Sequence, residues 1–170
     1  MVQRSYSYIK RKERIAIYPG SFDPVTNGHI DIVERSLRFI DRIVISVTNN
    51  PMKRHLFTQQ ERVAMLEEVF AGRHNVAVEH FHGLLVDELE RKGIYLVIRG
   101  LRAVSDFDYE FQMVLTNRTL LPRIETIFLM PREEYLYMSS SLVKEIAHMN
   151  GPVERFVPPA VARELRKKFA

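Results

Sequence analysis

Short apolar runs alternate with amphipathic segments along most of the chain. The runs, which have the length of buried strands, lie at 14–18, 42–48, 76–80, 94–98 and 124–130. Segments with apolar residues three or four positions apart lie at 28–40, 58–71, 84–92, 106–120, 139–149 and 159–168. This alternation is typical of a parallel sheet with crossover helices. We therefore predict an α/β fold with a doubly wound, five-stranded parallel sheet and helices on both faces.

Local signals support the predicted helix boundaries. Thr58 and Glu61 have the spacing of a capping box at a helix start. Gly93 follows a basic helix end, and Pro122 follows the segment at 106–120. Three of the predicted helices are therefore bounded by residues that favour their beginning or their end.

The length and charge distribution indicate one domain with a short extension. The chain has 170 residues and is 46% hydrophobic, which suffices for one core. Residues 1–13 carry four cations and one acid, so +3 of the total +4 lies there and only +1 lies in the remainder. We predict a mobile basic extension at 1–13 and a single domain at 14–170. This distribution argues against a nucleic-acid partner, because the domain itself is nearly neutral.

The composition also limits the chemistry and the location. The chain has no cysteine, which excludes disulfides, thiolate catalysis and cysteine-bound metals. No apolar run reaches the roughly 18 residues of a membrane span, and the polar N-terminus does not look like a secretory signal. We expect a cytoplasmic enzyme without a membrane partner.

Polar segments follow four of the five predicted strands. They are Ser21–His29, Asn49–Lys53, Arg99–Arg102 and Pro131–Ser141. Because ligands of open parallel sheets bind at the carboxyl ends of the strands, these segments should meet along one edge.

The first of these segments joins a strand to a helix. Gly28 allows a close approach to the backbone, and His29 lies in the first helical turn. A helix N-terminus presents free N–H groups and favours phosphate. His29 can add a hydrogen bond or a positive charge to the same phosphate. Asp23 and Asn27 are candidates for shaping the turn.

Three separated motifs resemble those of bacterial phosphopantetheine adenylyltransferases. Thr26–His29 matches the T/HxGH signature of nucleotidyltransferases, within the longer string PGSFDPVTNGH. IRGLR at 98–102 and SSSLVKE at 139–145 match further family motifs in the same order. The resemblance implies a Rossmann-like fold and adenylyl transfer from ATP to 4′-phosphopantetheine, giving dephospho-coenzyme A and pyrophosphate. It also implies a hexamer and feedback binding of coenzyme A. ATP as substrate further implies Mg²⁺ bound mainly through the ATP phosphates and water.

The resemblance also implies roles for individual residues, with His29 as the catalytic one. The positions expected to bind the acceptor substrate are Ser21, Lys53, Leu85 and Arg99. The positions expected to bind ATP are Ser21, Phe22, His29, Gly100, Leu101, Arg102, Glu110, Tyr135, Leu136, Tyr137, Met138, Ser139, Ser140 and Ser141.

The residues themselves support several of these roles, although each has a plainer interpretation. Lys53 and Arg99 follow strands, where a cation can hold the acceptor phosphate, and Arg99, directly after an apolar strand, is the stronger candidate. The plainer interpretation of each is an exposed surface cation. Ser139–Ser141 suit a triphosphate at a helix N-terminus, whereas capping needs only one serine. Leu85 fits core packing, and Glu110 by itself looks like a surface acid.

The motifs leave two other functions open. The first is another nucleotidyltransferase, using ATP or CTP with an acceptor such as nicotinamide mononucleotide or glycerol 3-phosphate. The second is a non-catalytic nucleotide-binding module, which the presence of His29 and Arg99 disfavours. His80 and His82 are too few for a metal site, so we interpret them as structural or surface residues.

Overall fold

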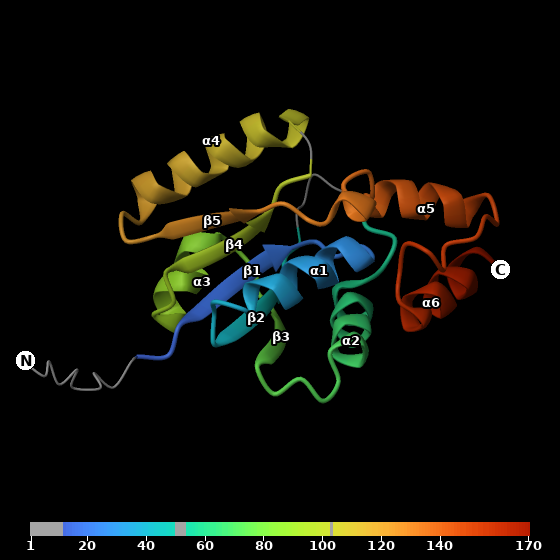
Figure 1. Ribbon diagram of the computed structural model, residues 1–170, viewed down its shortest axis with the longest axis horizontal. Coiled ribbons are helices and arrows are strands. Elements are labelled where there is room, and N and C mark those ends of the chain that lie inside the picture. Colours follow the sequence, from blue (N-terminus) through green and yellow to red (C-terminus); the bar gives the residue numbers. More distant parts are fainter. Residues whose placement is uncertain (1–11, 50–53, 103) are drawn as a thin grey trace, which may run out of the picture.

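The computed structural model describes residues 12–49, 54–102 and 104–170. Its sheet contains β1 (Ile15–Gly20), β2 (Arg42–Val47), β3 (Val76–His80), β4 (Leu96–Gly100) and β5 (Glu125–Leu129). All neighbouring strands are parallel, in the order β3-β2-β1-β4-β5 (Figure 1). The predicted doubly wound five-stranded sheet is confirmed, and its switch in strand order lies between β1 and β4.

Six α-helices accompany the sheet. They are α1 (Asn27–Ser36), α2 (Gln59–Val69), α3 (Leu85–Lys92), α4 (Val104–Leu120), α5 (Ser140–His148) and α6 (Pro159–Phe169). A 3-10 turn, η1 (Glu133–Tyr135), follows β5.

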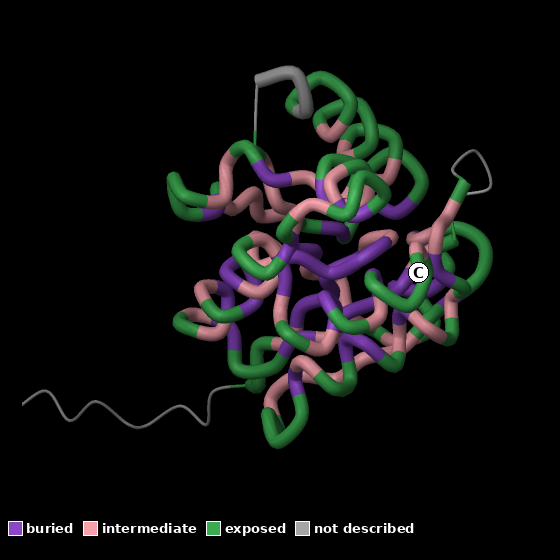
Figure 2. The backbone as a smooth tube through the Cα atoms, turned by 90° about the vertical axis from the view of Figure 1, so that its right-hand side faces the viewer, coloured by how far each residue is buried: buried purple, intermediate pink, exposed green. Residues whose placement is uncertain are grey.

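The alternating side chains of β1 divide the core into two parts. Ala16 and Tyr18 belong to a large cluster that includes residues of α1, α2, α5 and α6. Ile17 points to the other face, where it joins a smaller cluster with Val86 and Leu89 of α3. Buried stretches of the chain lie towards the middle of the molecule, whereas exposed segments lie at its outside (Figure 2). Both faces are covered, as the continuous apolar runs predict.

The fourth strand begins and ends two residues later than predicted. Gly93 has a φ of 65°, and the Ile94 N–H bonds to the Leu89 carbonyl, so both residues close the end of α3. At its other end β4 pairs Arg99 with Phe128 and Gly100 with Leu129. Arg99 and Gly100 are therefore the last residues of the strand and do not follow it.

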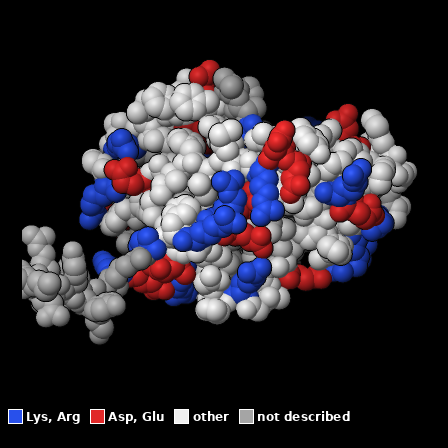
Figure 3. Space-filling model, in the orientation of Figure 1, with Lys and Arg blue, Asp and Glu red and all other residues white. Residues whose placement is uncertain are grey.

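Helix α4 leaves much of its apolar surface exposed. It lies along β5 at the outside of the molecule (Figure 1). Its exposed large apolar side chains are Phe107, Tyr109, Phe111, Met113, Leu115 and Leu120. Elsewhere charges of both signs are interspersed, as the face in Figure 3 shows. The predicted mobile extension falls almost entirely on residues 1–11, which lie outside the described residues.

Candidate active site

The carboxyl ends of β1 and β4 bring the predicted motifs together at the switch point. The Arg99 Nη1 donates to the carbonyl of Pro19, 3.0 Å away, and so ties the end of β4 to the end of β1. Tyr18 lies beside them. Burial raises the pKa of Tyr18, whereas the nearby positive charges of Arg99 and Arg102 act to lower it. The Arg102 charge also acts on His29. Residues from two separated motifs, the loop after β1 and IRGLR, therefore share one electrostatic environment.

The loop after β1 packs tightly on itself. Phe22 is buried and has a φ of 48°, a left-handed conformation that non-glycine residues rarely adopt. A Cβ at Gly20 would lie 2.9 Å from the Phe22 ring, so only glycine fits there without a shift. A Cβ at Gly28 would lie 3.5 Å from the Tyr135 Cβ, which means that Gly28 faces η1. From the sequence, Gly28 is expected to let a ligand approach the backbone closely, whereas the structure places Tyr135 there.

The imidazole of His29 is held in one tautomer. The backbone N–H of Thr26 donates to Nδ1 of His29 over 3.0 Å. Because a backbone N–H can only donate, Nδ1 is an acceptor and the proton of the neutral ring lies on Nε2. Burial, reinforced by the Arg102 charge, lowers the pKa of His29 to about 4. At neutral pH His29 is therefore an uncharged hydrogen-bond donor through Nε2, which favours the first of the two roles that the sequence allowed.

Arg99 is paired with Glu110 of α4. Its Nε donates to one Glu110 oxygen over 2.7 Å, and its Nη2 donates to the other oxygen. Burial alone would lower the pKa of Arg99, but the Glu110 carboxylate outweighs it and raises that pKa. Together with the bond to Pro19, these contacts use three of the five guanidinium N–H groups. Arg99 is thus a fixed cation, oriented by the residue that the resemblance assigned to ATP.

The serine motif docks helix α5 onto the loop after β1. Ser139 is the N-cap, and its side chain accepts the Leu142 N–H. Ser140 donates to the Pro24 carbonyl over 2.8 Å, whereas Ser141 is exposed. Lys144 donates to Asp23 over 2.7 Å. Ser139 therefore takes the plain capping role, and Ser140 and Lys144 fix the N-terminal part of α5 beside the His29 loop.

A second contact joins the IRGLR motif to the segment after β5. The Arg102 Nη1 donates to the Met138 carbonyl over 2.9 Å, and the Leu101 N–H donates to the Leu129 carbonyl. Asp31 of α1 accepts the backbone N–H of Arg132 over 3.0 Å and forms an ion pair with the Arg132 Nε, also at 3.0 Å. The predicted meeting of the motifs after β1, β4 and β5 is therefore observed.

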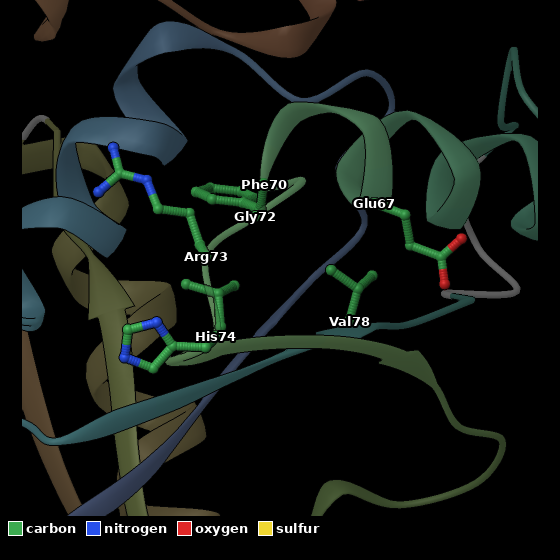
Figure 4. Close-up of a pocket in the computed structure, with 7 residues that line it drawn as sticks. Glu67, Phe70, Gly72, Arg73, His74 and Val78 are labelled. Carbon is green, nitrogen blue, oxygen red and sulfur yellow. The ribbon is translucent and has the colours of Figure 1, made fainter.

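An open cavity of about 410 Å³ lies away from this edge. Its lining includes Phe70, Arg73 and His74, between the end of α2 and the start of β3 (Figure 4). Because it lies at the amino end of its strand, it is separate from the switch point between β1 and β4. The convergent polar groups, rather than this hollow, mark the candidate site.

Comparisons with known proteins show the family to which the chain belongs. A family described as cytidylyltransferase-like matches residues 17–146. The phosphopantetheine adenylyltransferase of Alkaliphilus metalliredigens is 52% identical over 155 residues, which are 91% of this chain and 99% of that protein. The enzyme of that name from Caldanaerobacter subterraneus subsp. tengcongensis is 53% identical over 156 residues, 92% of this chain and 98% of that protein. The chain belongs to the phosphopantetheine adenylyltransferase family.

A solved structure shows that the fold extends beyond this family. A nicotinate-nucleotide adenylyltransferase structure from Vibrio parahaemolyticus superposes with a TM-score of 0.67 at 17% sequence identity. The match covers 91% of this chain and 99% of that chain. At this identity the likeness concerns the fold alone, and it confirms the Rossmann-like architecture.

Several residues that the family resemblance singles out lie less centrally. Leu85 begins α3 and packs half-buried against the smaller core, as its plainer interpretation predicted. Lys53 lies outside the described residues. Tyr137 is exposed, while Met138 is buried. The roles assigned to Leu85, Lys53 and Tyr135–Met138 in this family member stay predictions.

The sequence predicts only a turn-shaping role for Asp23, but the structure makes it a centre of contacts. Its carboxylate is 4% exposed and accepts the N–H groups of Leu56 and Phe57, at 3.0 and 2.9 Å, besides the Lys144 ammonium. Burial alone would raise the pKa of Asp23, but Lys144 and the two N–H groups lower it below its ordinary value. Asp23 thus joins the segment before α2 and helix α5 to the loop after β1.

We expect replacement of Asp23 by alanine to destabilise the protein more than any exposed acid does. The change leaves Lys144 and two N–H groups without their acceptor, and breaking a buried pair in this way costs about 3–5 kcal/mol. Thermal denaturation measures the effect, with Glu34→Ala, which breaks an exposed pair to Arg73, as the control. An equal fall in melting temperature for both variants would contradict the role given to Asp23.

We also expect His29 to titrate well below its ordinary range. Nitrogen-detected NMR at pH 7 should show an unprotonated Nδ1, and the midpoint should lie near the pKa of about 4. Because the unfolded ring has a pKa of about 6.5, the unfolded chain gains the proton first as pH falls. His29 should therefore contribute to a loss of stability between about pH 6.5 and 4. A titration midpoint of His29 at or above pH 6.5 would contradict its assignment as a neutral hydrogen-bond donor.

The described residues contain no group of three His, Asp or Glu side chains that could hold a metal ion. His80 and His82 are neighbours, with ring centroids 5.6 Å apart. In the same part of the chain, no helix is long and apolar enough to cross a bilayer.

Proposed function

We propose that the chain transfers the adenylyl group of ATP to 4′-phosphopantetheine, forming dephospho-coenzyme A and releasing pyrophosphate. The observation that carries this proposal is the identity of about half of all residues with phosphopantetheine adenylyltransferases over nearly their full length. The convergence of the His29 loop, Arg99 and α5 at one sheet edge supports it independently.

The chemistry requires position and charge more than a protein nucleophile. An acceptor phosphate oxygen attacks the α-phosphorus of ATP in line, so that a new P–O bond forms and the bond to the bridging oxygen of pyrophosphate breaks. The acceptor is a phosphate monoester, largely a dianion at neutral pH, and needs no base. The Nε2–H of His29 donates to the α-phosphate as charge develops on its oxygens. No covalent enzyme intermediate is formed.

Arg99 is the described cation best placed to hold the acceptor phosphate. Glu110 and Pro19 fix its guanidinium at the carboxyl end of β4, so a phosphate meets a preoriented charge. We assign Lys53 to the same phosphate by resemblance, with Ser21 and Leu85 contacting the rest of the acceptor.

We assign ATP to the other side of His29. The segment Gly100–Arg102 and the turn before α5 touch each other and flank the N-terminus of that helix. Phosphate oxygens of ATP suit the N–H groups and hydroxyls there. Mg²⁺ would be carried by those phosphates and by water, since the described residues offer no carboxylate cage.

We further propose that copies of the chain assemble through α4. Its exposed apolar residues are the kind of surface that associates in water. The family resemblance points to a hexamer with feedback binding of coenzyme A, acting in the cytoplasm. Light scattering on the purified chain tests the assembly, and competition by coenzyme A against ATP tests the feedback.

An acceptor panel tests the reaction itself. Purified protein is incubated with Mg²⁺ and ATP, or CTP, together with 4′-phosphopantetheine, nicotinamide mononucleotide or glycerol 3-phosphate, and pyrophosphate is measured. We expect release only with ATP and 4′-phosphopantetheine, in equal amounts with dephospho-coenzyme A. Release with another acceptor instead would establish the alternative nucleotidyltransferase.

A further inference from the structure

Arg62 is a cation buried inside the protein, on a helix that the predicted site does not include. It lies in α2 and is 1% exposed, on the same helical face as Met65 and Leu66. Its guanidinium donates to the Ser21 carbonyl over 2.7 Å and to the Thr48 carbonyl over 2.9 Å, both from Nη1. A third bond runs from Nη2 to Oδ1 of Asn49, over 3.0 Å. One side chain thus connects the loop after β1 to the chain leaving β2.

The hydrogen bonds of Arg62 to described residues go to neutral groups. Burial lowers the pKa of Arg62, and the carboxylate of Asp23 partly offsets that effect from nearby. A buried cation is costly where no carboxylate bonds to it directly, and an apolar side chain would pack beside Met65 and Leu66 without that cost. The position therefore carries a cation for a reason other than core stability.

The bonds of Arg62 constrain the two loops that the adenylyl transfer depends on. Ser21 precedes Phe22 in the loop that ends at His29, and its carbonyl is the atom that Arg62 holds. Thr48 directly follows β2, and its N–H bonds to the Gly20 carbonyl over 2.8 Å. The two loops therefore meet at adjacent residues, with Arg62 bound to both.

We propose that Arg62 is a positioning residue that sets the spacing between the His29 loop and residues Thr48 and Asn49 after β2, and so aligns the acceptor with ATP. This proposal rests on the proposed function. The planar guanidinium directs its N–H groups to the Ser21 and Thr48 carbonyls and the Asn49 amide, while its Nε bonds to the Thr58 carbonyl of its own helix cap. An ammonium keeps the charge but not these directions. In this proposal Arg62 acts on the substrates indirectly, through Ser21, Thr48 and Asn49.

The test compares three variants of α2 in the full chain. Arg62→Met removes the charge and the fork, and Arg62→Lys keeps the charge alone. Met65→Ala is the matched control, because Met65 is buried on the same helix and belongs to the core cluster. Kinetics are measured well below each melting temperature, so that all three variants are folded.

We expect Arg62→Met to lower kcat by about ten- to a hundredfold, because a misplacement of about 1 Å costs about a hundredfold in rate. The KM of the acceptor should rise more than that of ATP. Arg62→Lys should recover part of the loss, and Met65→Ala should lower only the melting temperature. Unchanged kinetics in Arg62→Met, or an equal kinetic loss in Met65→Ala, would overturn the proposal.

Two further measurements keep the test decisive. Amide hydrogen exchange, which needs no activity, should rise at residues 21–23 and 47–49 in Arg62→Met and not in Met65→Ala. Unchanged exchange there overturns the proposal even if the wild-type chain fails to make dephospho-coenzyme A. If Arg62→Met does not fold, Asn49→Ala removes one exposed partner, and it should raise the acceptor KM while leaving the melting temperature nearly unchanged. An unchanged acceptor KM in Asn49→Ala would then count against the proposal.

Discussion

Replacing His29 with alanine should lower kcat by roughly a hundred- to a thousandfold, the usual loss on removing one preorganised donor to a developing oxyanion. The KM values should change less, because the Nε2–H bond strengthens as charge develops on the α-phosphate. The fold should persist, since the variant loses mainly the bond from the Thr26 N–H to Nδ1. That bond belongs to a helix cap, whose loss costs about 1 kcal/mol.

Two companion variants make this result specific. His29→Gln retains a side-chain N–H donor and should recover part of the rate, whereas His74→Ala removes an exposed histidine and should leave the rate unchanged. The melting temperature of each variant confirms that it is folded. A folded His29→Ala protein with nearly normal turnover would remove His29 from the mechanism.

Replacing Arg99 with alanine should weaken binding of 4′-phosphopantetheine by about ten- to two-hundredfold, which corresponds to one charge-assisted hydrogen bond of roughly 1.5–3 kcal/mol. Binding of ATP should change much less. Arg99→Lys should recover only part, because a point charge replaces an oriented fork. Calorimetric titration with each ligand separately measures both affinities.

The pairing with Glu110 adds a structural consequence to this prediction. The Glu110 side chain is 13% exposed, so removal of Arg99 leaves a half-buried carboxylate without its partner. Arg99→Ala should therefore also lower the melting temperature, and adding Glu110→Gln should restore part of it without restoring acceptor binding. Arg123→Ala, at an exposed pair with Glu90, is the control. Weaker ATP binding alone would show that Arg99 does not hold the acceptor.

The sequence predicts the fold and the meeting of the motifs well, because both follow from local pattern. Apolar runs of strand length, separated by amphipathic helices, leave few arrangements other than a parallel sheet. Once the strands are placed, the segments after β1, β4 and β5 must lie at one edge. The displaced start of β4 shows the limit of this reasoning, since Ile94 continues the apolar run but bonds into the end of α3.

The contacts that connect the motifs could not be predicted in the same way. The tautomer of His29 depends on a single N–H three residues earlier, and the Arg99–Glu110 pair depends on how α4 lies against β4. Arg62 could have been noticed in the sequence, because this cation lies on the same helical face as the apolar residues Met65 and Leu66. Asp23 left a weaker one, as an aspartate in a turn usually bonds its own backbone.

A crystal structure with dephospho-coenzyme A bound would test the central claim most directly, because this product joins the adenylyl and pantetheine halves through one diphosphate. We expect the diphosphate to lie at the carboxyl ends of β1 and β4, within hydrogen-bond distance of His29 Nε2. The pantetheine half should extend from the diphosphate on the Arg99 side, and the adenosine should extend towards α5. Binding of the diphosphate away from His29, for instance in the hollow beside Arg73 and His74, would contradict the account.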